Sequence, residues 1–183
     1  ILTYTYSAVG EYTVTVVALS GGAATVEYSE VVTITNPLLM PIDFEDSTLN
    51  YSFVDFGNAQ STVISNPDPT GVNTSSTVGQ SVKFNGSEVW AGSFLTIDEP
   101  VDFSSLNNIA VDVWTSEIGE VVKLKLENSA NPDINTEVDM TTTVNQGWET
   151  LIYDFSASDL SQEYDRVVIF FDFGNSGDDT SYY

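Results

Sequence analysis

Cysteine and histidine are both absent from the sequence, and each absence removes a class of chemistry. Without cysteine the chain has no disulfide, no thiol nucleophile and no ligand for an iron–sulfur cluster. Without histidine it has neither a Ser-His-Asp nor a Cys-His catalytic arrangement, and no histidine ligand for zinc. No stretch approaches the roughly 18 apolar residues of a membrane-spanning helix. We therefore expect no membrane insertion by this segment.

Basic residues are also scarce. The 183 residues include 4 Lys and Arg against 27 Asp and Glu, which gives a formal net charge of -23. Binding to the phosphate backbone of a nucleic acid requires a basic surface, and four scattered cations cannot supply one. Anionic membrane surfaces are disfavoured for the same reason. We therefore expect no nucleic acid among the partners.

The residues that are abundant favour β-structure. Val, Thr, Tyr, Phe and Ile gather in short runs, and Gly, Pro, Asn, Asp and Ser separate those runs. No window shows the sustained period of 3.6 residues that an amphipathic helix would have. Hydrophobic residues make up 42% of the chain, which is far from the composition of a disordered protein. The sequence therefore predicts an all-β protein.

Residues 1–36 predict a meander of three strands, with turns at Gly10 and at residues 20–23. One pattern in this segment consists of Tyr4, Tyr6, Gly10, Tyr12, Val14, Val16 and Val32-Thr33-Ile34. With this pattern the segment resembles the C-terminal part of a PKD (polycystic kidney disease-type) domain, an Ig-like sandwich. The resemblance implies a partial Ig-like sandwich that serves as a spacer or interaction module and has no catalytic site.

Residues 37–41 are the expected linker, because two prolines so close together favour an extended connection. Residues 42–183 then predict a second domain, an antiparallel, jelly-roll-like β-sandwich. Its strands are expected at residues 42–44, 51–55, 62–65, 81–84, 92–97, 109–115, 121–127, 136–141, 149–154 and 166–173.

One hairpin is expected to join the strands at 109–115 and 121–127. One register of this hairpin pairs apolar residues on the buried side and opposite charges on the other side. In that register Val113 faces Val122, and Asp112 faces Lys123. This register leaves Trp114 on the polar face of its strand. Burial in the core therefore does not explain this tryptophan.

The second domain carries a resemblance of its own. The stretches that carry it are IDFED, VWAG, NNIAVDVWTSEIGEVVKLKLEN, GWETLIYDFS and VVIFFDFGNSGDDTSYY. Together they resemble the non-catalytic carbohydrate-binding sandwiches that follow PKD domains in surface glycan-binding proteins and secreted polysaccharide-degrading enzymes of marine Bacteroidota. The resemblance implies a polysaccharide partner, with a neutral β-glucan such as laminarin as our expectation. It also implies an extracellular or outer-membrane cell-surface location, a larger multimodular protein and no enzymatic activity.

Two tryptophans are the candidate carbohydrate-binding residues, because a flat exposed ring can cover the apolar face of a sugar. Trp90 lies in a loop-like stretch with small neighbours that would leave its ring open, and Trp114 points away from the core. The alternative is that Trp90 caps the core and that Trp114 packs over the stem of Lys123. Trp148 is expected to have a structural role at a sandwich edge.

Asp43 and Glu45 are the candidate metal ligands. The alternation of a strand places both carboxylates on one face, and Ca²⁺ prefers hard oxygen ligands of this kind. Resemblance to jelly-roll modules that hold a structural Ca²⁺ supports this assignment. The alternative is that both are solvated acids in a protein that has 27 of them.

Two other functions remain open. In the first, the chain is a purely structural or adhesive Ig-like pair whose tryptophans are packed. In the second, it is a glycoside hydrolase, which needs two carboxyl groups roughly 5–10 Å apart across a sugar-sized cleft. A sandwich with short loops leaves little room for such a cleft.

The excess of acidic residues predicts a dependence of stability on salt. Repulsion among like charges destabilises the folded state at low ionic strength, and ~0.5 M NaCl shortens the Debye length to roughly 4 Å. The melting temperature should therefore rise between low salt and ~0.5 M NaCl, which thermal denaturation followed by circular dichroism would measure. A flat or falling curve over this range would contradict the prediction.

Overall fold

The computed structural model describes residues 3–6, 8–18 and 26–183. Regular structure in these residues is entirely β, so they contain no helix that could cross a membrane. The chain divides into two compact units. The first comprises Ile1–Pro37 and Thr48–Asn50, and the second comprises Leu38–Ser47 and Tyr51–Tyr183.

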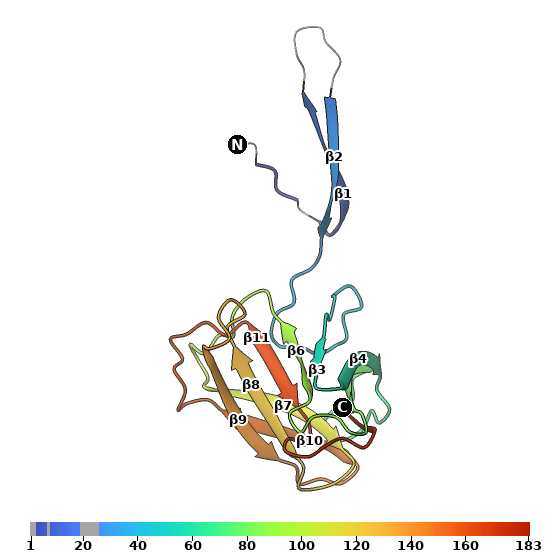
Figure 1. The fold of residues 1–183 in the computed structure, drawn as a ribbon, viewed down its shortest axis with the longest axis vertical. Coiled ribbons are helices and arrows are strands. Elements are labelled where there is room, and N and C mark those ends of the chain that lie inside the picture. The colour runs from blue at the N-terminus through green and yellow to red at the C-terminus, as the bar shows by residue number, and fades with distance from the viewer. Residues whose placement is uncertain (1–2, 7, 19–25) are drawn as a thin grey trace. The chain divides into compact units, whose positions relative to one another are not determined.

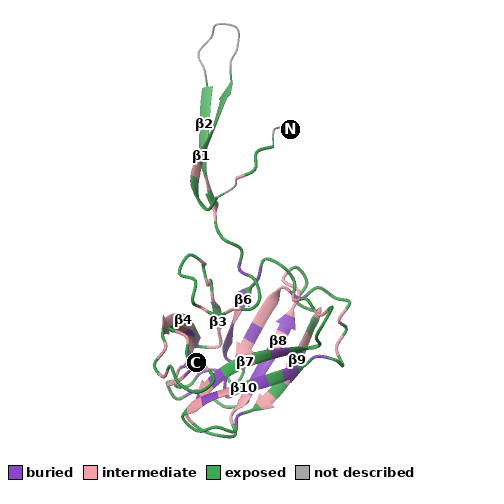
Figure 2. Cartoon of the chain, turned by 180° about the vertical axis from the view of Figure 1, so that it is seen from behind, coloured by how far each residue is buried: buried purple, intermediate pink, exposed green. Residues whose placement is uncertain are grey.

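The first unit is built on one antiparallel hairpin. Strand β1 (Gly10–Ala18) pairs with β2 (Val26–Ile34) from Gly10 opposite Ile34 to Ala18 opposite Val26. Most residues of both strands are exposed, as the green ribbon of Figure 2 shows. The expected turn at residues 20–23 lies outside the described residues.

The expectation of a third strand near Tyr4 and Tyr6 was wrong, because residues 3–6 have no strand structure. Tyr6 instead packs between two rings, with centroids 4.9 Å from Tyr4 and 4.4 Å from Tyr12. The Tyr12 hydroxyl donates a hydrogen bond to the Ala8 carbonyl at 2.8 Å. Contacts between aromatic rings therefore take the place of ladder pairing in this segment.

The second unit is a sandwich of antiparallel strands (Figure 1). One layer is the five-stranded sheet β3-β6-β11-β8-β9, and the other consists of the ribbons β12-β5-β4 and β10-β7. The strands are β3 (Val54–Phe56), β4 (Ala59–Ser65), β5 (Thr77–Lys83), β6 (Gly92–Thr96), β7 (Asn108–Thr115), β8 (Val121–Glu127), β9 (Asn135–Thr141), β10 (Gly147–Asp154), β11 (Arg166–Phe170) and β12 (Thr180–Tyr182).

Most strands expected in this unit are present with shifted ends, but two expectations failed. Residues 42–44 do not form a strand, since Phe44 has a φ of 60° and its carbonyl accepts a hydrogen bond from Thr77 Oγ1. Strand β12 was missed, because it is three residues long and follows a stretch rich in Gly, Asp and Ser. Its pairing with β5 is a tertiary contact that local alternation does not indicate.

The expected hairpin between residues 109–115 and 121–127 is also absent. Strand β7 pairs with β10, whereas β8 lies between β11 and β9 in the other layer. Asp112 therefore accepts a hydrogen bond from Thr150 Oγ1 at 2.6 Å, and Lys123 forms an ion pair with Glu137 at 2.6 Å. The predicted buried face was nevertheless correct, because alternation specifies which side is buried and not which strand is the neighbour.

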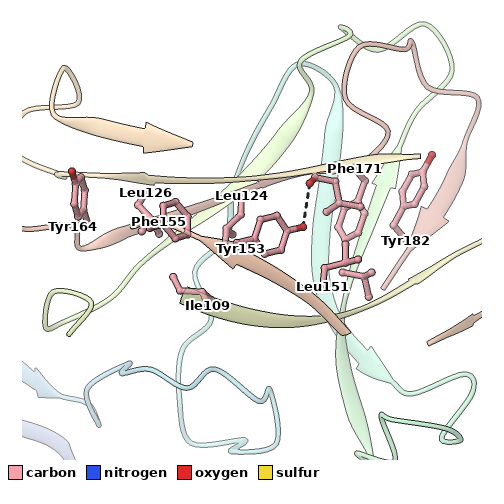
Figure 3. Close-up of a cluster of buried hydrophobic side chains, with 11 residues drawn as sticks. Ile109, Leu124, Leu126, Leu151, Tyr153, Phe155, Tyr164, Phe171 and Tyr182 are labelled. Atoms are coloured by element: carbon pink, nitrogen blue, oxygen red, sulfur yellow. Dashed lines mark hydrogen bonds between the residues drawn. The ribbon is translucent and has the colours of Figure 1, made fainter. Parts of the chain in front are cut away.

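The core lies between the two layers and draws on both (Figure 3). Val113, Leu151 and Tyr153 come from the β7–β10 ribbon, and Val122 and Leu124 come from β8. Tyr153 is fully buried, and its hydroxyl donates a hydrogen bond to the Val122 carbonyl at 3.1 Å. Burial raises the pKa of this hydroxyl, which stays protonated and can donate. One side chain thus fills the core and bonds one layer to the other.

Replacing Tyr153 by Phe should lower the free energy of unfolding by about 1–2 kcal/mol, since a buried carbonyl loses its donor with little loss of apolar surface. Urea denaturation at neutral pH would measure the change. Tyr164→Phe is the matched control, because its hydroxyl bonds the Asp159 carbonyl in a less enclosed position where water can replace it. Equal losses in the two variants would contradict a bridging role for Tyr153.

Candidate functional site

Trp90 lies just before β6 and is 47% exposed. Its ring stacks on Phe56 of β3, with centroids 6.1 Å apart and ring planes inclined by 20°. One face of the indole therefore has a hydrophobic support. The exposed ring is a flat apolar surface of the kind that binds the face of a sugar.

The loop that carries Trp90 is fixed by backbone hydrogen bonds. Glu88 N–H donates to the Gly57 carbonyl at 2.9 Å, and Ala91 N–H donates to the Glu88 carbonyl at 2.9 Å. Gly57 has a φ of 67°, and a Cβ atom there would lie 2.8 Å from the Ala91 backbone. Only glycine fits this close approach. The position of Trp90 is therefore set before any ligand binds.

Lys83 fixes the same loop from inside the protein. It is 1% exposed, and its ammonium donates to the carbonyls of Val89 at 3.4 Å, Phe171 at 3.2 Å and Asp172 at 2.8 Å. Burial lowers the pKa of Lys83, and the charge of Asp172 opposes this effect. Lys83 therefore ties the Trp90 loop to the segment after β11.

An aromatic row continues from Trp90 across the outer face of the five-stranded sheet. Residues that face each other across antiparallel strands share a side, and the core residue Leu124 lies opposite Ile169. Phe170, next along β11, is therefore on the outer side of the sheet, where neighbouring side chains leave it only 9% exposed. Its ring meets Phe56 edge-to-face at 5.5 Å and meets Phe173 at 5.5 Å. Trp90, Phe56, Phe170 and Phe173 together form what we call the aromatic row.

Charged side chains lie beside the aromatic row on the same outer face. Arg166 of β11 stacks over the Phe94 ring at 4.3 Å and forms an ion pair with Glu127 at 3.1 Å. Lys123 of β8 lies over Phe173 at 4.4 Å and forms an ion pair with Glu137. These groups offer fixed hydrogen-bond donors and acceptors next to apolar rings. Sequence reasoning paired Lys123 with Asp112 and did not bring these groups together, because the face is assembled from several strands.

Trp114 and Trp148 lie opposite each other in the β7–β10 ladder, on the outer side of the other layer. Both indole N–H groups donate to Asp68, from Trp114 to Oδ2 at 3.2 Å and from Trp148 to the carbonyl at 2.7 Å. Trp148 is buried, so its expected structural role is confirmed. Trp114 is partly buried and meets Tyr183 edge-to-face at 5.5 Å, and its strand lies in a different layer from the strand of Lys123. The structure therefore places Trp90 and Trp114 on different layers and does not combine them in one platform.

No family model matches the chain, and no curated protein matches it. A solved carbohydrate-binding module of the β-sandwich superfamily, described for its promiscuous specificity, has a TM-score of 0.52 at 15% identity, over 100% of this chain and 74% of its own. The family 11 carbohydrate-binding module of the cellulosomal cellulase Lic26A-Cel5E of Clostridium thermocellum has a TM-score of 0.51 at 11% identity, over 82% and 91%.

The fold resembles the β-sandwich of carbohydrate-binding modules. A third structure, an arabinose-bound family 51 α-L-arabinofuranosidase, has a TM-score of 0.52 at 18% identity. That match covers 80% of this chain but only 25% of the enzyme. At 11–18% identity, the similarity to these structures is one of fold alone.

Within this carbohydrate-binding-module-like sandwich, Asp43 and Glu45 lie near the start of β5. Glu45 Oε1 accepts hydrogen bonds from Thr77 N–H at 2.6 Å and from Thr77 Oγ1 at 2.7 Å, and these bonds lower the pKa of Glu45. Asp43 Oδ1 accepts from Glu45 N–H at 3.0 Å. Among the residues that the structure describes, no group of three acidic side chains is placed to hold a metal ion. The calcium site stays a prediction, and melting with EDTA and with Ca²⁺ would test it.

A different acidic group has an unusual environment. Glu120 lines a hollow of about 290 Å³ together with Glu117, Asp172 and Asp178. Burial, followed by the negative charges of Asp172 and Glu117, raises the pKa of Glu120 to about 7. Its Oε2 atom is buried and has no hydrogen-bond partner within the described part of the chain. The carboxyl group is therefore easier to accommodate in its protonated form.

This environment predicts how stability depends on pH. The pKa of Glu120 is higher in the folded protein than in the unfolded chain, so its protonated form favours folding. This stabilisation is fully present below about pH 4.5 and is lost as the pH rises through about 7. After allowance for solvent screening, the free energy of unfolding should fall by about 1–2 kcal/mol between pH 5.5 and pH 8.

Glu120→Gln should remove most of this fall, and urea denaturation at both pH values would measure it. Glu149→Gln is the control, because hydrogen bonds from Thr143 and Val144 outweigh burial and lower the pKa of Glu149, so its titration lies below this window. If the free energy of unfolding depends on pH in the same way in the parent and in Glu120→Gln, Glu120 is not the group responsible.

Proposed function

We propose that the second unit is a non-catalytic polysaccharide-binding module and that the outer face of its five-stranded sheet is the binding surface. One observation carries the proposal: Trp90 is exposed, stacked on Phe56 and held in place by a hydrogen-bonded loop. A surface tryptophan that serves only as packing would not need such support. The fold similarity to carbohydrate-binding modules supports the same function.

The chemistry of the face suits a sugar polymer. A flat indole can cover ~100 Å² of a sugar's apolar face, worth on the order of 2 kcal/mol before ordering costs. On the same face, toward the other edge of the sheet, the Glu137 and Asp139 carboxylates of β9 are about half exposed and can accept hydrogen bonds from hydroxyl groups. Both are held by Lys123, which limits the entropy lost when a ligand binds.

The net charge of -23 indicates the kind of polysaccharide. Sulfated and uronate-rich glycans are polyanions, and an acidic surface repels them at low and moderate salt. A neutral glycan meets no such barrier. We therefore propose a neutral β-glucan such as laminarin as the ligand.

We further propose that this module belongs to a larger cell-surface or secreted protein that acts on or captures polysaccharides. One similar structure is named as a module of a cellulosomal cellulase, and another match covers a quarter of an arabinofuranosidase. In this arrangement the module binds the polymer and any hydrolysis takes place elsewhere. Release of reducing sugar from laminarin by this chain alone would contradict the non-catalytic assignment.

Replacement of Trp90 by Ala tests the site. The variant should melt within a few degrees of the parent, because an exposed ring buries little area. Its affinity for laminarin should fall about tenfold or more, since ~1.5–2 kcal/mol of stacking is lost. Affinity electrophoresis in gels that contain laminarin would measure binding, and binding should vary little with salt.

Trp114→Ala is the matched comparison on the opposite layer. If the binding face is the one described, this variant should bind like the parent and melt at a lower temperature, because it loses the Asp68 hydrogen bond and packing against Tyr183. If Trp114→Ala binds weakly and Trp90→Ala binds normally, the proposed face is wrong and the ligand uses the β7–β10 side. The earlier expectation that both rings bind sugar would require both variants to bind weakly.

A further inference from the structure

Two loops that lie far apart in the sequence are joined beside the aromatic row. One is the Trp90 loop, which connects β5 to β6, and the other is the segment after β11, which connects β11 to β12. Gly86 N–H donates to the Gly177 carbonyl at 3.1 Å, and Gly174 N–H donates to the Val89 carbonyl at 3.0 Å. Backbone hydrogen bonds therefore hold one loop on the other.

Buried groups lie at the centre of this contact. Ser87 is 3% exposed, and its Oγ accepts a hydrogen bond from the buried Gly177 N–H at 2.9 Å. The Ser87 carbonyl accepts a second bond, from Ser176 Oγ at 2.7 Å. A Cβ atom on Gly177 would collide with the Lys83 carbonyl, so only glycine permits this close approach. The two loops are therefore in direct backbone contact.

The Lys83 ammonium joins the same two loops from inside. A lysine ammonium has three N–H donors, and here three backbone carbonyls accept them. Two of these carbonyls belong to the segment after β11, and the third is that of Val89. The Val89 carbonyl is part of the peptide group that precedes Trp90, and it also accepts from Gly174 N–H. The backbone at Trp90 is thus held by the lysine and by the other loop.

Loss of the ammonium would leave these three carbonyls without their donor. A buried carbonyl without a partner is costly, so the carbonyls would need to reach water. Lys83 is 1% exposed, and water can therefore enter only if the Trp90 loop moves away from the segment after β11. The Trp90 ring would then leave its stack on Phe56. The position of an exposed ring thus depends on a charge beneath the surface.

We infer that Lys83 is a positioning residue of the carbohydrate-binding site. Its buried charge keeps the Trp90 loop docked on the segment after β11, and in this way it sets the affinity for the glycan without touching it. The inference rests on the proposed function, because Trp90 is the residue through which Lys83 acts on binding.

Lys83→Met tests the inference, because methionine is a flexible side chain that keeps the apolar contacts and has neither the charge nor an N–H donor. Its affinity for laminarin, measured by affinity electrophoresis, should fall about tenfold or more. The same change made in Trp90→Ala should weaken binding no further, because residues that act as one unit are not additive. Equal losses with and without the Trp90 ring would show that Lys83 acts elsewhere and would overturn the inference.

Fluorine NMR of the protein labelled with 5-fluorotryptophan follows the ring without a ligand. The chain has three tryptophans, and the spectrum of Trp90→Ala identifies the resonance of Trp90. In Lys83→Met this resonance should move toward the shift of the urea-unfolded chain, while those of Trp114 and Trp148 stay in place. An unmoved Trp90 resonance would overturn the inference. If the parent does not bind laminarin, the proposed function is wrong, and this resonance still decides whether Lys83 positions the ring.

Tyr153→Phe is the control for a general loss of stability, because it removes a buried hydrogen bond between β10 and β8. It should bind laminarin like the parent and leave the Trp90 resonance unchanged. If it weakens binding as much as Lys83→Met does, the effect of the lysine is one of stability alone and the inference fails.

Ser87→Ala replaces Lys83→Met if that variant does not fold. It removes the acceptor of the buried Gly177 N–H and leaves Lys83 in place. Because one hydrogen bond between the loops is lost, laminarin affinity should fall by about threefold or more, and the Trp90 resonance should move in the same direction. A parent-like affinity together with a parent-like resonance would overturn the inference.

Discussion

Alternate side chains of β7, β8 and β10 meet between the two layers of the second unit and exclude water from the space between them. Val113, Leu124 and Tyr153 belong to this set, and the Tyr153 hydroxyl adds a hydrogen bond across the core. Because strand geometry sends the intervening residues to the other side, the same packing orients the residues of the outer faces. The position of Phe170 beside Phe56, and that of Trp114 beside Trp148, are consequences of which neighbours are buried.

The four cations show how a strongly acidic chain uses its few positive charges. Lys83 is inside the protein and bonds three carbonyls, which ties the Trp90 loop to the segment after β11. Lys123, Lys125 and Arg166 lie together on the outer face of the five-stranded sheet, each paired with a carboxylate. These cations offset the negative charges of Glu127, Glu137 and Asp139. The cations therefore stabilise the face that we propose as the binding surface.

Sequence reasoning located most strands and most of the buried face, but it assigned the wrong neighbouring strand to β7. Strand β7 was expected beside β8, and the chain instead places these strands in different layers. The apparent charge match between Asp112 and Lys123 was misleading, because the two residues find partners on other strands, in Thr150 and Glu137. A strand of three residues such as β12 gives too little alternation to be recognised, and its pairing with β5 is a contact between distant parts of the chain.

The sequence by itself determined the class of the fold, the excluded chemistry, the acidic character and the exposure of Trp90, because these depend on composition and on local alternation. Tertiary structure alone decided the rest. It separated Trp90 from Trp114, buried Lys83 and raised the pKa of Glu120. Each of these features arises from the meeting of strands that lie far apart in the chain, and the alternation within one strand carries no information about which distant strand will lie beside it.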